Sequence, residues 1–399
     1  MFLFQYNDNV FMESAMRNNL SKFSDFRSLR GLAPYEQSLL CEAAKTAIEV
    51  SLKVKQGEQV LIISNPEPNV LAISEALYDA SLYVDACPVL IFQPRKSQMD
   101  FAEPTVISSL YARPDVIISM SADKMGKDSQ GIANPHIYDG IKYDNIFHLF
   151  LNGEKCCRSF WSPSVTIDSF IRTVLIDYAE LGQRCAAIKD VLDRAAAVYV
   201  TAPGGTNIKI GLNNRTAKSD DGDFSLPGSG GNLPAGETFI SPENGTANGC
   251  ICFDGSISTN SGDTVISQPI NCLVENGFVT DISGGSEAAI LLETIKAAEF
   301  NAMEFERAGK LPKGSGAIYA HNARNIGELG IGLNPKAVIS GNMLEDEKAF
   351  RTCHFAIGMN YDDDAPSLIH LDGLVRNPTI TAVFDDGQER IIEREGELI

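Results

Sequence analysis

Hydrophobic positions in the first half of the chain alternate between helical spacing and short continuous runs. Apolar residues recur at helical spacing over residues 35 to 55, and Gly57 is expected to end that helix. Continuous apolar runs at 59–64, 88–92, 116–120 and 145–151 predict buried strands, with a further helix over 71–82. Short apolar strands separated by helices predict βαβ units, and therefore a parallel sheet that is covered on both faces.

The pattern changes near residue 195. From there the chain is rich in Gly, Asn, Asp, Ser and Pro, with short strands predicted at 208–212, 238–241, 250–253 and 277–282 and one long helix at 286–307. We therefore expect an N-terminal extension over residues 1–30, an α/β domain with a parallel sheet over 31–194, and a β-rich α+β domain over 195–399.

Charge and composition limit the partners and the cellular compartment that we expect for this protein. The 399 residues carry 33 Lys and Arg against 52 Asp and Glu, a formal net charge of -19, which argues against nucleic acid or an anionic membrane surface as a partner. The N-terminus has no signal-peptide pattern, and no apolar run approaches the length of about 18 residues that a membrane span needs. We expect a cytoplasmic protein whose nine cysteines are reduced thiols.

A histidine and carboxylate cluster is predicted near the C-terminus. On a strand over 368–375, His370 and Asp372 would share one face, because side chains two residues apart point the same way. A second strand over 353–358 and a turn over 360–366 would form a hairpin that brings His354 close to this pair.

Two glutamates complete the candidate site. Glu237 follows a Gly-rich approach to a strand, and Glu328 lies between Gly327 and Gly330. Imidazole and carboxylate suit Zn, Mn, Co or Fe(II). Five such ligands exceed what one tetrahedral ion needs, which favours two ions that share a bridging carboxylate and act in hydrolysis.

Other polar residues fit the site less directly. His136 and His148 have no identifiable carboxylate partner and are expected to be structural, while His321 is left as a candidate for the edge of the site. Two interpretations are open for the charged run Glu345, Asp346, Glu347 and Lys348. Its side chains could orient the metal ligands, or they could form a solvated surface. The chain has no His-Glu-x-x-His, Gly-x-Ser-x-Gly or phosphate-loop motif.

With these motifs the chain resembles the M29 metallo-aminopeptidases, the leucyl aminopeptidase T and aminopeptidase S group. The resemblance is clearest over residues 230–390 and rests on five segments, namely 232–237, 327–335, 341–348, 354–358 and 370–372. It implies that two divalent ions (Zn, Co, Mn or Mg) are held by Glu237, Glu328, His354, His370 and Asp372. It further implies that Glu237 bridges the ions, that Tyr361 and Glu237 are catalytic, and that the protein is a homodimer which releases N-terminal amino acids from peptides.

The same scaffold also resembles a ring-cleaving enzyme, 2,5-dihydroxypyridine dioxygenase. That resemblance implies one Fe(II) ion held at the positions of His354, His370 and Asp372, and a small non-peptide substrate. The mononuclear form lacks a carboxylate where Glu237 stands, so the presence of both Glu237 and Glu328 favours two metals and peptide hydrolysis. A third alternative, a catalytically silent binding protein, would be expected to lose at least one buried ligand.

Overall fold

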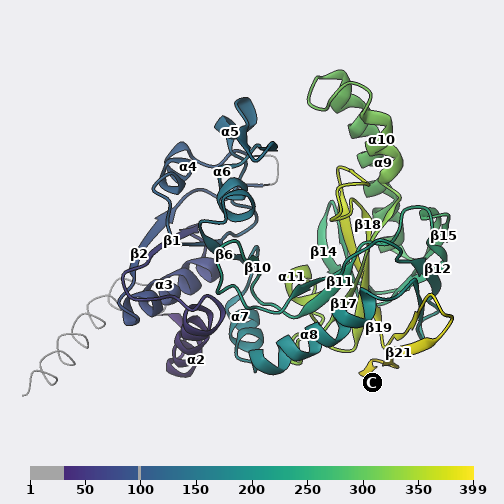
Figure 1. Ribbon diagram of the computed structural model, residues 1–399, viewed down its shortest axis with the longest axis horizontal. Helices are drawn as coiled ribbons and strands as arrows, with labels where there is room; N and C mark the ends of the chain where they lie inside the picture. Colours follow the sequence, from purple (N-terminus) through teal and green to yellow (C-terminus); the bar gives the residue numbers. More distant parts are fainter. Residues whose placement is uncertain (1–30, 98–99) are drawn as a thin grey trace, which may run out of the picture. The chain divides into compact units, whose positions relative to one another are not determined.

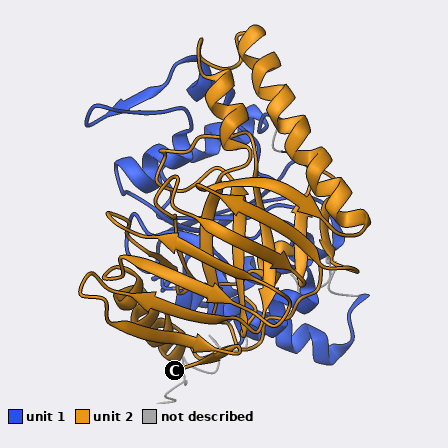
Figure 2. Ribbon diagram, turned by 90° about the vertical axis from the view of Figure 1, so that its right-hand side faces the viewer, with its two compact units in different colours: residues 1–175, 223–233 blue, residues 176–222, 234–399 orange. Residues whose placement is uncertain are grey.

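The computed structural model describes residues 31–97 and 100–399, and the chain divides into two compact units (Figure 2). Unit 1 comprises Met1–Leu175 and Asp223–Leu233, and unit 2 comprises Ile176–Gly222 and Pro234–Ile399. The N-terminal extension expected over 1–30 lies outside the described residues. An α/β unit with a parallel sheet and a β-rich second unit are both present, as the sequence predicted.

The division between the units differs from the expected boundary after residue 194. It falls after Leu175, so that the helix Tyr178–Leu192 belongs to unit 2. In addition, Asp223–Leu233 returns to unit 1. The change in composition near residue 195 coincides with the first strand of unit 2. It gives no sign that the preceding helix, Tyr178–Leu192, also belongs to this unit.

Unit 1 is built on a five-stranded sheet of order β10-β6-β3-β1-β2, in which all neighbours are parallel. Its elements are α2 (Pro34–Thr46), η2 (Ala47–Ser51), β1 (Gln59–Ser64), α3 (Pro68–Tyr83), β2 (Cys87–Phe92), α4 (Pro104–Leu110), β3 (Val116–Met120), α5 (Ser129–Ala133), β4 (His136–Tyr138), β5 (Ile141–Tyr143), α6 (Ile146–His148), η3 (Leu149–Gly153), β6 (Arg158–Trp161), α7 (Ile167–Val174) and β10 (Gly230–Asn232) (Figure 1).

Local sequence explains how the main helices of unit 1 begin. Helices α2, α3 and α4 start at Pro34, Pro68 and Pro104, where the missing N–H of proline costs no helical hydrogen bond. The strands between them are apolar on both faces. Leu61 of β1 and Ile117 of β3 belong to one buried cluster with residues of α4 and η3, while α3 packs on the sheet from the other side (Figure 1).

One predicted strand of unit 1 is wrong. Residues 145–151 form α6 and the π-helical turn η3 instead. The side-chain oxygen of Asn145 accepts a hydrogen bond from the backbone N–H of Phe147 at 2.9 Å and so caps the helix. Phe147, Leu149, Phe150 and Leu151 are all buried, and a short run that is apolar on every side does not distinguish a buried strand from a buried helical turn.

Unit 2 contains two antiparallel sheets, of seven and eight strands. Its elements are α8 (Tyr178–Leu192), β7 (Ala197–Thr201), β8 (Asn207–Gly211), β9 (Lys218–Asp220), β11 (Glu237–Ile240), β12 (Asn248–Phe253), β13 (Ser256–Thr259), β14 (Gly262–Val265), β15 (Ile270–Glu275), β16 (Phe278–Ser283), α9 (Ser286–Arg307), α10 (Gly316–Asn322), β17 (Ile326–Gly332), α11 (Met343–Asp346), β18 (Thr352–Gly358), β19 (His370–Arg376), β20 (Thr379–Val383), β21 (Glu389–Arg394) and β22 (Glu397–Leu398).

The seven-stranded sheet has the order β14-β13-β19-β18-β17-β11-β9, and the eight-stranded sheet has the order β16-β15-β12-β8-β7-β20-β21-β22. The two sheets approach each other where Gly373 of β19 faces Phe253 of β12: a Cβ atom at Gly373 would lie 2.5 Å from the phenylalanine ring. Glycine is therefore needed for this close packing. Helix α8 contacts β11, where the hydroxyl of Thr238 donates a hydrogen bond to the carbonyl of Cys185 at 3.3 Å.

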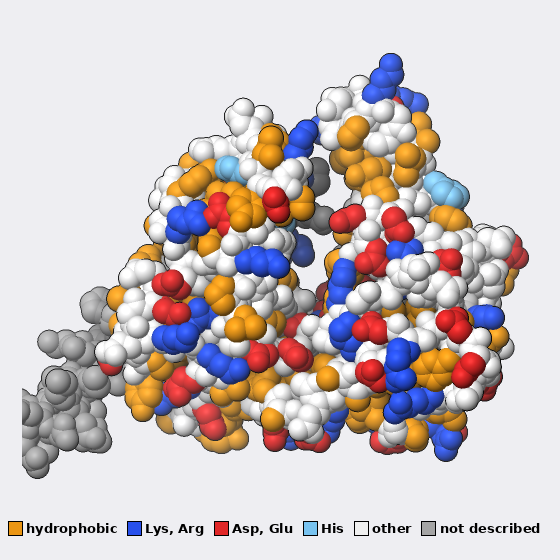
Figure 3. Space-filling model, in the orientation of Figure 1, with side chains coloured by type: hydrophobic (Ala, Val, Ile, Leu, Met, Phe, Trp, Pro, Cys, Tyr) orange, Lys and Arg blue, Asp and Glu red, His pale blue; other side chains and the backbone are white. Residues whose placement is uncertain are grey.

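The surface shows acidic and basic side chains interspersed over the face drawn in Figure 3. Apolar side chains are exposed on α9 and α10, among them Phe300, Met303 and Ile318. Within residues 31–97 and 100–399, no helix combines the length and apolar character that a membrane span requires. All nine cysteines lie in the described part of the chain and are free thiols.

Candidate metal centre

Four neighbouring strands of the seven-stranded sheet carry the predicted ligands. Glu237 begins β11, Glu328 lies on β17, His354 lies on β18, and His370 and Asp372 lie on β19. These strands are adjacent in the order β19-β18-β17-β11. Adjacent strands lie about 4.8 Å apart, so side chains on one face of the sheet come within reach of a common ion.

The hairpin predicted from the sequence is confirmed. Strands β18 and β19 pair antiparallel, with Ala356 opposite Asp372 and Gly358 opposite His370. Because His354 lies two residues from Ala356, it projects from the same face as Asp372.

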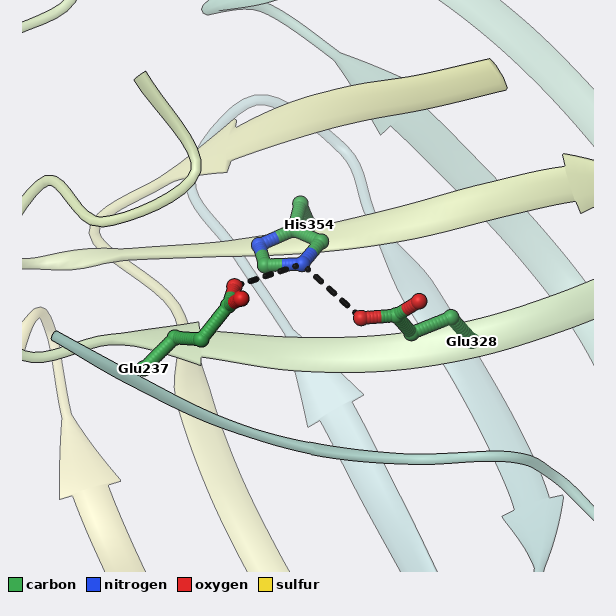
Figure 4. A group of neighbouring side chains, drawn as sticks. All are labelled: Glu237, Glu328 and His354. Carbon is green, nitrogen blue, oxygen red and sulfur yellow. Dashed lines mark hydrogen bonds and ion pairs between the residues drawn. The ribbon is translucent and has the colours of Figure 1, made fainter. Parts of the chain in front are cut away.

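His354 lies between the two glutamates (Figure 4). Its Nε2 atom is 3.4 Å from Oε2 of Glu237 and 3.3 Å from Oε1 of Glu328. The other oxygen of Glu328 lies 3.3 Å from Nε2 of His370, which is in turn 3.4 Å from Oδ1 of Asp372. Glu328 therefore contacts both histidines, one with each carboxylate oxygen.

Glu328 lies at the centre of the ligand cluster, whereas the resemblance to the M29 group assigned the bridge between two ions to Glu237. Of the two histidines Glu237 contacts His354 alone, whereas Glu328 takes part in two of the three groups whose ligand atoms lie within 4.8 Å of one another. One group contains Glu237, Glu328 and His354, and another contains Glu328, His370 and Asp372. The central position of Glu328 follows from its strand, because β17 lies between β11 and β18.

The tautomer of His370 suits a metal ligand. Its Nδ1 atom lies 2.8 Å from the carbonyl oxygen of Met359, a distance at which the ring donates an Nδ1–H hydrogen bond to the backbone. In the neutral imidazole this leaves the Nε2 lone pair directed at Glu328 and Asp372. A backbone carbonyl that orients a histidine in this way is a regular feature around metal ligands.

Several buried polar atoms of the cluster accept no hydrogen bond from the part of the chain that the structure describes. They are Oε2 of Glu237, Oε2 of Glu328 and Oδ1 of Asp372. Burying unsatisfied carboxylate oxygens is costly, and a cation bound among them would remove this cost. The donor set therefore fits divalent metal ions.

The third group of potential ligands adds Glu347, with His354 and Asp372. The sequence offered two readings of the run 345–348, and the structure separates its members. Glu345 accepts a hydrogen bond from the backbone of Val338 at 2.8 Å, and Asp346 accepts one from Ser340 at 2.7 Å, so both hold the loop before α11. Glu347 and Lys348 instead face the cluster.

Lys348 is 0% exposed, and its ammonium forms ion pairs with carboxylates of the cluster. Its Nζ atom lies 2.6 Å from Oε1 of Glu237, 2.5 Å from Oε1 of Glu347 and 3.8 Å from Oδ2 of Asp220. Asp220 is the register partner of Glu237 across β9 and β11. The charged run 345–348 was the only feature of the sequence that pointed to Glu347 and Lys348. The spacing of four consecutive residues does not show which of them point inward.

Burial and mutual contact shift the ionisation of the cluster. Burial raises the pKa of Glu328, but the hydrogen bond with His354 and the close contact with His370 outweigh it and bring this pKa down to about 2. Burial lowers the pKa of His354, and here the neighbouring carboxylates, Glu328 foremost, outweigh it and raise the value to about 9. Burial, together with the charges of Glu237 and Asp372, raises the pKa of Glu347 to about 8.

Tyr361 lies at the rim of the cluster, in the turn between β18 and β19. Its ring centroid is 4.9 Å from that of His370 and 5.4 Å from that of Phe239. Desolvation of the phenol on the side that faces the cluster, together with the negative charges of Glu328 and Asp372, raises the pKa of Tyr361 well above its ordinary value, so the hydroxyl stays protonated and can donate a hydrogen bond.

The remaining histidines lie in other environments. His321 stacks on Phe278, with ring centroids 4.1 Å apart, and belongs to none of the three ligand groups. His136 packs against Tyr111, and His148 packs against Phe147.

A family model described as NicX, 2,5-dihydroxypyridine 5,6-dioxygenase, matches residues 171–356. The structure of 2,5-dihydroxypyridine dioxygenase from Pseudomonas putida KT2440 superposes with a TM-score of 0.66 at 17% identity, covering 91% of this chain and 97% of that chain. AmpT from Thermus thermophilus gives a TM-score of 0.62 at 15% identity, covering 91% and 99%.

The chain shares its fold with both proteins. The AmpT match confirms, at the level of fold, the resemblance to the M29 group that the motifs indicated. The dioxygenase family model includes Glu237, Glu328 and His354 but ends before His370 and Asp372. A search of curated protein sequences found no match.

Proposed function

We propose that this chain is a metal-dependent aminopeptidase that releases N-terminal amino acids from peptides and uses two divalent ions. The observation that carries the proposal is Glu328, whose two carboxylate oxygens lie 3.3 Å from two different histidines. A carboxylate in this position is suited to bridge two ions, one beside His354 and Glu237 and the other beside His370 and Asp372.

Bound divalent ions would supply Lewis acidity and a water molecule whose pKa is lowered towards about 7. The side chains of the protein would orient the ligands and supply a hydrogen-bond donor. The His370 ring is oriented by the carbonyl of Met359, which directs Nε2 into the centre. The protonated hydroxyl of Tyr361 would donate a hydrogen bond to the oxyanion that develops when a peptide carbonyl is attacked.

The proposal is tested with metal-stripped protein to which Zn, Co, Mn or Mg is added back. Unblocked and N-blocked dipeptides are compared as substrates, because an aminopeptidase requires the free amine. We expect cleavage of unblocked peptides only, loss of activity in Glu237→Gln, and unchanged activity in the exposed control Glu275→Gln. Absence of cleavage with every metal would refute the proposal.

A second candidate function is oxidative ring cleavage with one Fe(II) ion. It is favoured by the match of the dioxygenase family model to residues 171–356 and by His354, His370 and Asp372, which form the two-histidine, one-carboxylate set common among Fe(II) oxygenases. The test is oxygen uptake by the Fe(II)-loaded protein with 2,5-dihydroxypyridine, followed together with the loss of the aromatic absorbance. Uptake coupled to loss of the ring would replace the aminopeptidase assignment.

A further inference from the structure

Lys348 is a charged group inside the candidate centre that is not itself a metal ligand. It follows α11 and is 0% exposed, and its ammonium contacts the carboxylates of Glu237 and Glu347 at 2.6 and 2.5 Å. A buried ammonium is tolerated only when it is paired, and these two contacts supply the pairing. The same contacts constrain the two carboxylates.

Each carboxylate is held by one oxygen. Lys348 contacts Oε1 of Glu237, while Oε2 of that residue faces Nε2 of His354 at 3.4 Å. Lys348 also contacts Oε1 of Glu347, a residue that belongs to a ligand group with His354 and Asp372. Both carboxylates thus flank the same histidine, and one ammonium fixes the orientation of both.

We propose that Lys348 is a positioning residue that makes Glu237 and Glu347 single-oxygen ligands. Because their Oε1 atoms are occupied by the ammonium, each carboxylate offers only its other oxygen to an ion beside His354. Single-oxygen ligation leaves coordination positions open for water and substrate, as a catalytic site requires. The inference rests on the proposed metal centre, but not on which reaction that centre performs.

Without Lys348, the carboxylates of Glu237 and Glu347 would lose the ammonium that holds their Oε1 atoms. We expect them to turn apart when no metal is bound and to bind an ion with both oxygens when it enters. Residues that orient ligands in this way typically contribute about 10- to 100-fold to metal affinity. The effect should appear in the binding of the ion beside His354, because the ion pairs of Lys348 within the described residues are with Asp220, Glu237 and Glu347 and not with Asp372.

The test titrates metal-stripped Lys348→Met with Co(II), by calorimetry and by visible absorption. We expect one of the two binding steps to weaken by about 10- to 100-fold. The absorption of that step should also lose intensity, because two-oxygen ligation raises the coordination number of Co(II). Lys348→Arg keeps the positive charge and should recover part of the affinity, whereas Lys296→Met, on the exposed face of α9, should behave as the wild type.

Three outcomes would overturn the proposal: a Lys348→Met protein with unchanged Co(II) affinity and spectrum, one that binds Co(II) more tightly, or an equal loss in both steps. If Lys348→Met does not fold, Lys348→Gln is measured instead, because its amide removes the ammonium but leaves a polar group among the carboxylates. Unchanged binding there also refutes the role. Wild-type protein that binds Co(II) but cleaves no peptide would refute the proposed function alone, whereas wild-type protein that binds no Co(II) would refute both.

Discussion

Gly330 lies opposite His354 across β17 and β18, and a Cβ atom built at Gly330 would lie 2.0 Å from Nε2 of that histidine. The imidazole occupies the space that any side chain at position 330 would fill. The absence of a side chain is therefore what allows His354 to lie over β17, between Glu237 and Glu328.

Gly330→Ala is expected to displace the His354 ring. The added methyl group should destabilise the protein by about 1–3 kcal/mol, as overpacking does, and lower metal affinity by about tenfold or more. Thermal unfolding and calorimetric titration with Zn measure the two effects. The control is Gly182→Ala in α8, where an added Cβ meets nothing within 4 Å and a gain of about 0.5–1 kcal/mol is expected. Normal metal binding by Gly330→Ala would contradict the prediction.

Glu328→Gln and Glu237→Gln are expected to differ in how many ions they affect. Glu328 contacts both histidines, so its replacement should weaken both binding steps by about tenfold or more. Of the two histidines Glu237 contacts only His354, so its replacement should weaken one step. Calorimetry of the metal-stripped proteins resolves the steps, and a Glu328→Gln protein with one unaffected step would rule out the bridging position.

Tyr361→Phe is expected to reduce kcat by about 10²- to 10³-fold, the usual cost of removing one oxyanion donor. Metal content should be unchanged, because Tyr361 belongs to none of the ligand groups. Tyr199→Phe on β7 is a matched control, since the two tyrosines are 45% and 41% exposed and Tyr199 lies on the other sheet. Steady-state kinetics on an unblocked dipeptide compare kcat between the two variants. Equal kcat in Tyr361→Phe and Tyr199→Phe would exclude the donor role.

Metal binding is expected to release protons near neutral pH. The surrounding carboxylates outweigh burial and raise the pKa of His354 to about 9, so its ring carries a proton at pH 7 before an ion enters, and they raise the pKa of His370 in the same direction. Ligands bind metal in the deprotonated form, and apparent affinity should therefore rise with pH up to about 9. Titrations in buffers of different ionisation enthalpy count the protons, and a count of zero at pH 7 would be incompatible with this ionisation.

Glu393 on β21 is expected to make stability depend on pH. It is 1% exposed, and burial together with Glu397 raises its pKa from 4.5 to about 8. The folded protein holds this proton more tightly than the unfolded chain does. The resulting stabilisation is complete below pH 4.5 and is lost as pH rises to 8, by about 1.4 kcal/mol per pH unit.

Glu393→Gln should remove this dependence and be more stable than the wild type at pH 8. Denaturant unfolding at pH 5, 6.5 and 8, at fixed metal loading, compares the slopes. Glu389→Gln, an exposed position on the same strand, should keep the wild-type slope. Parallel pH profiles for Glu393→Gln and the wild type would show that Glu393 is not the responsible group.

Elements with a clear period were predictable, and the failures have local causes. The hairpin that carries His354, His370 and Asp372 followed from alternation on two strands and a polar turn. The strand predicted at 145–151 failed because its residues are buried on all sides and Asn145 caps a helix. The fifth parallel strand, β10, is only three residues long and lies far along the chain from β6, its partner, so no local pattern marked it.

The sequence by itself determined which residue types were available for the centre and that His370 and Asp372 share a face, because a strand has a period of two. Only the tertiary structure decided that Glu328, rather than Glu237, contacts both histidines, and that Glu347 and Lys348 turn inward while Glu345 and Asp346 hold a loop. The order of strands in a sheet brings together residues that are far apart in the chain. Periodicity reports the face of each strand but not its neighbours.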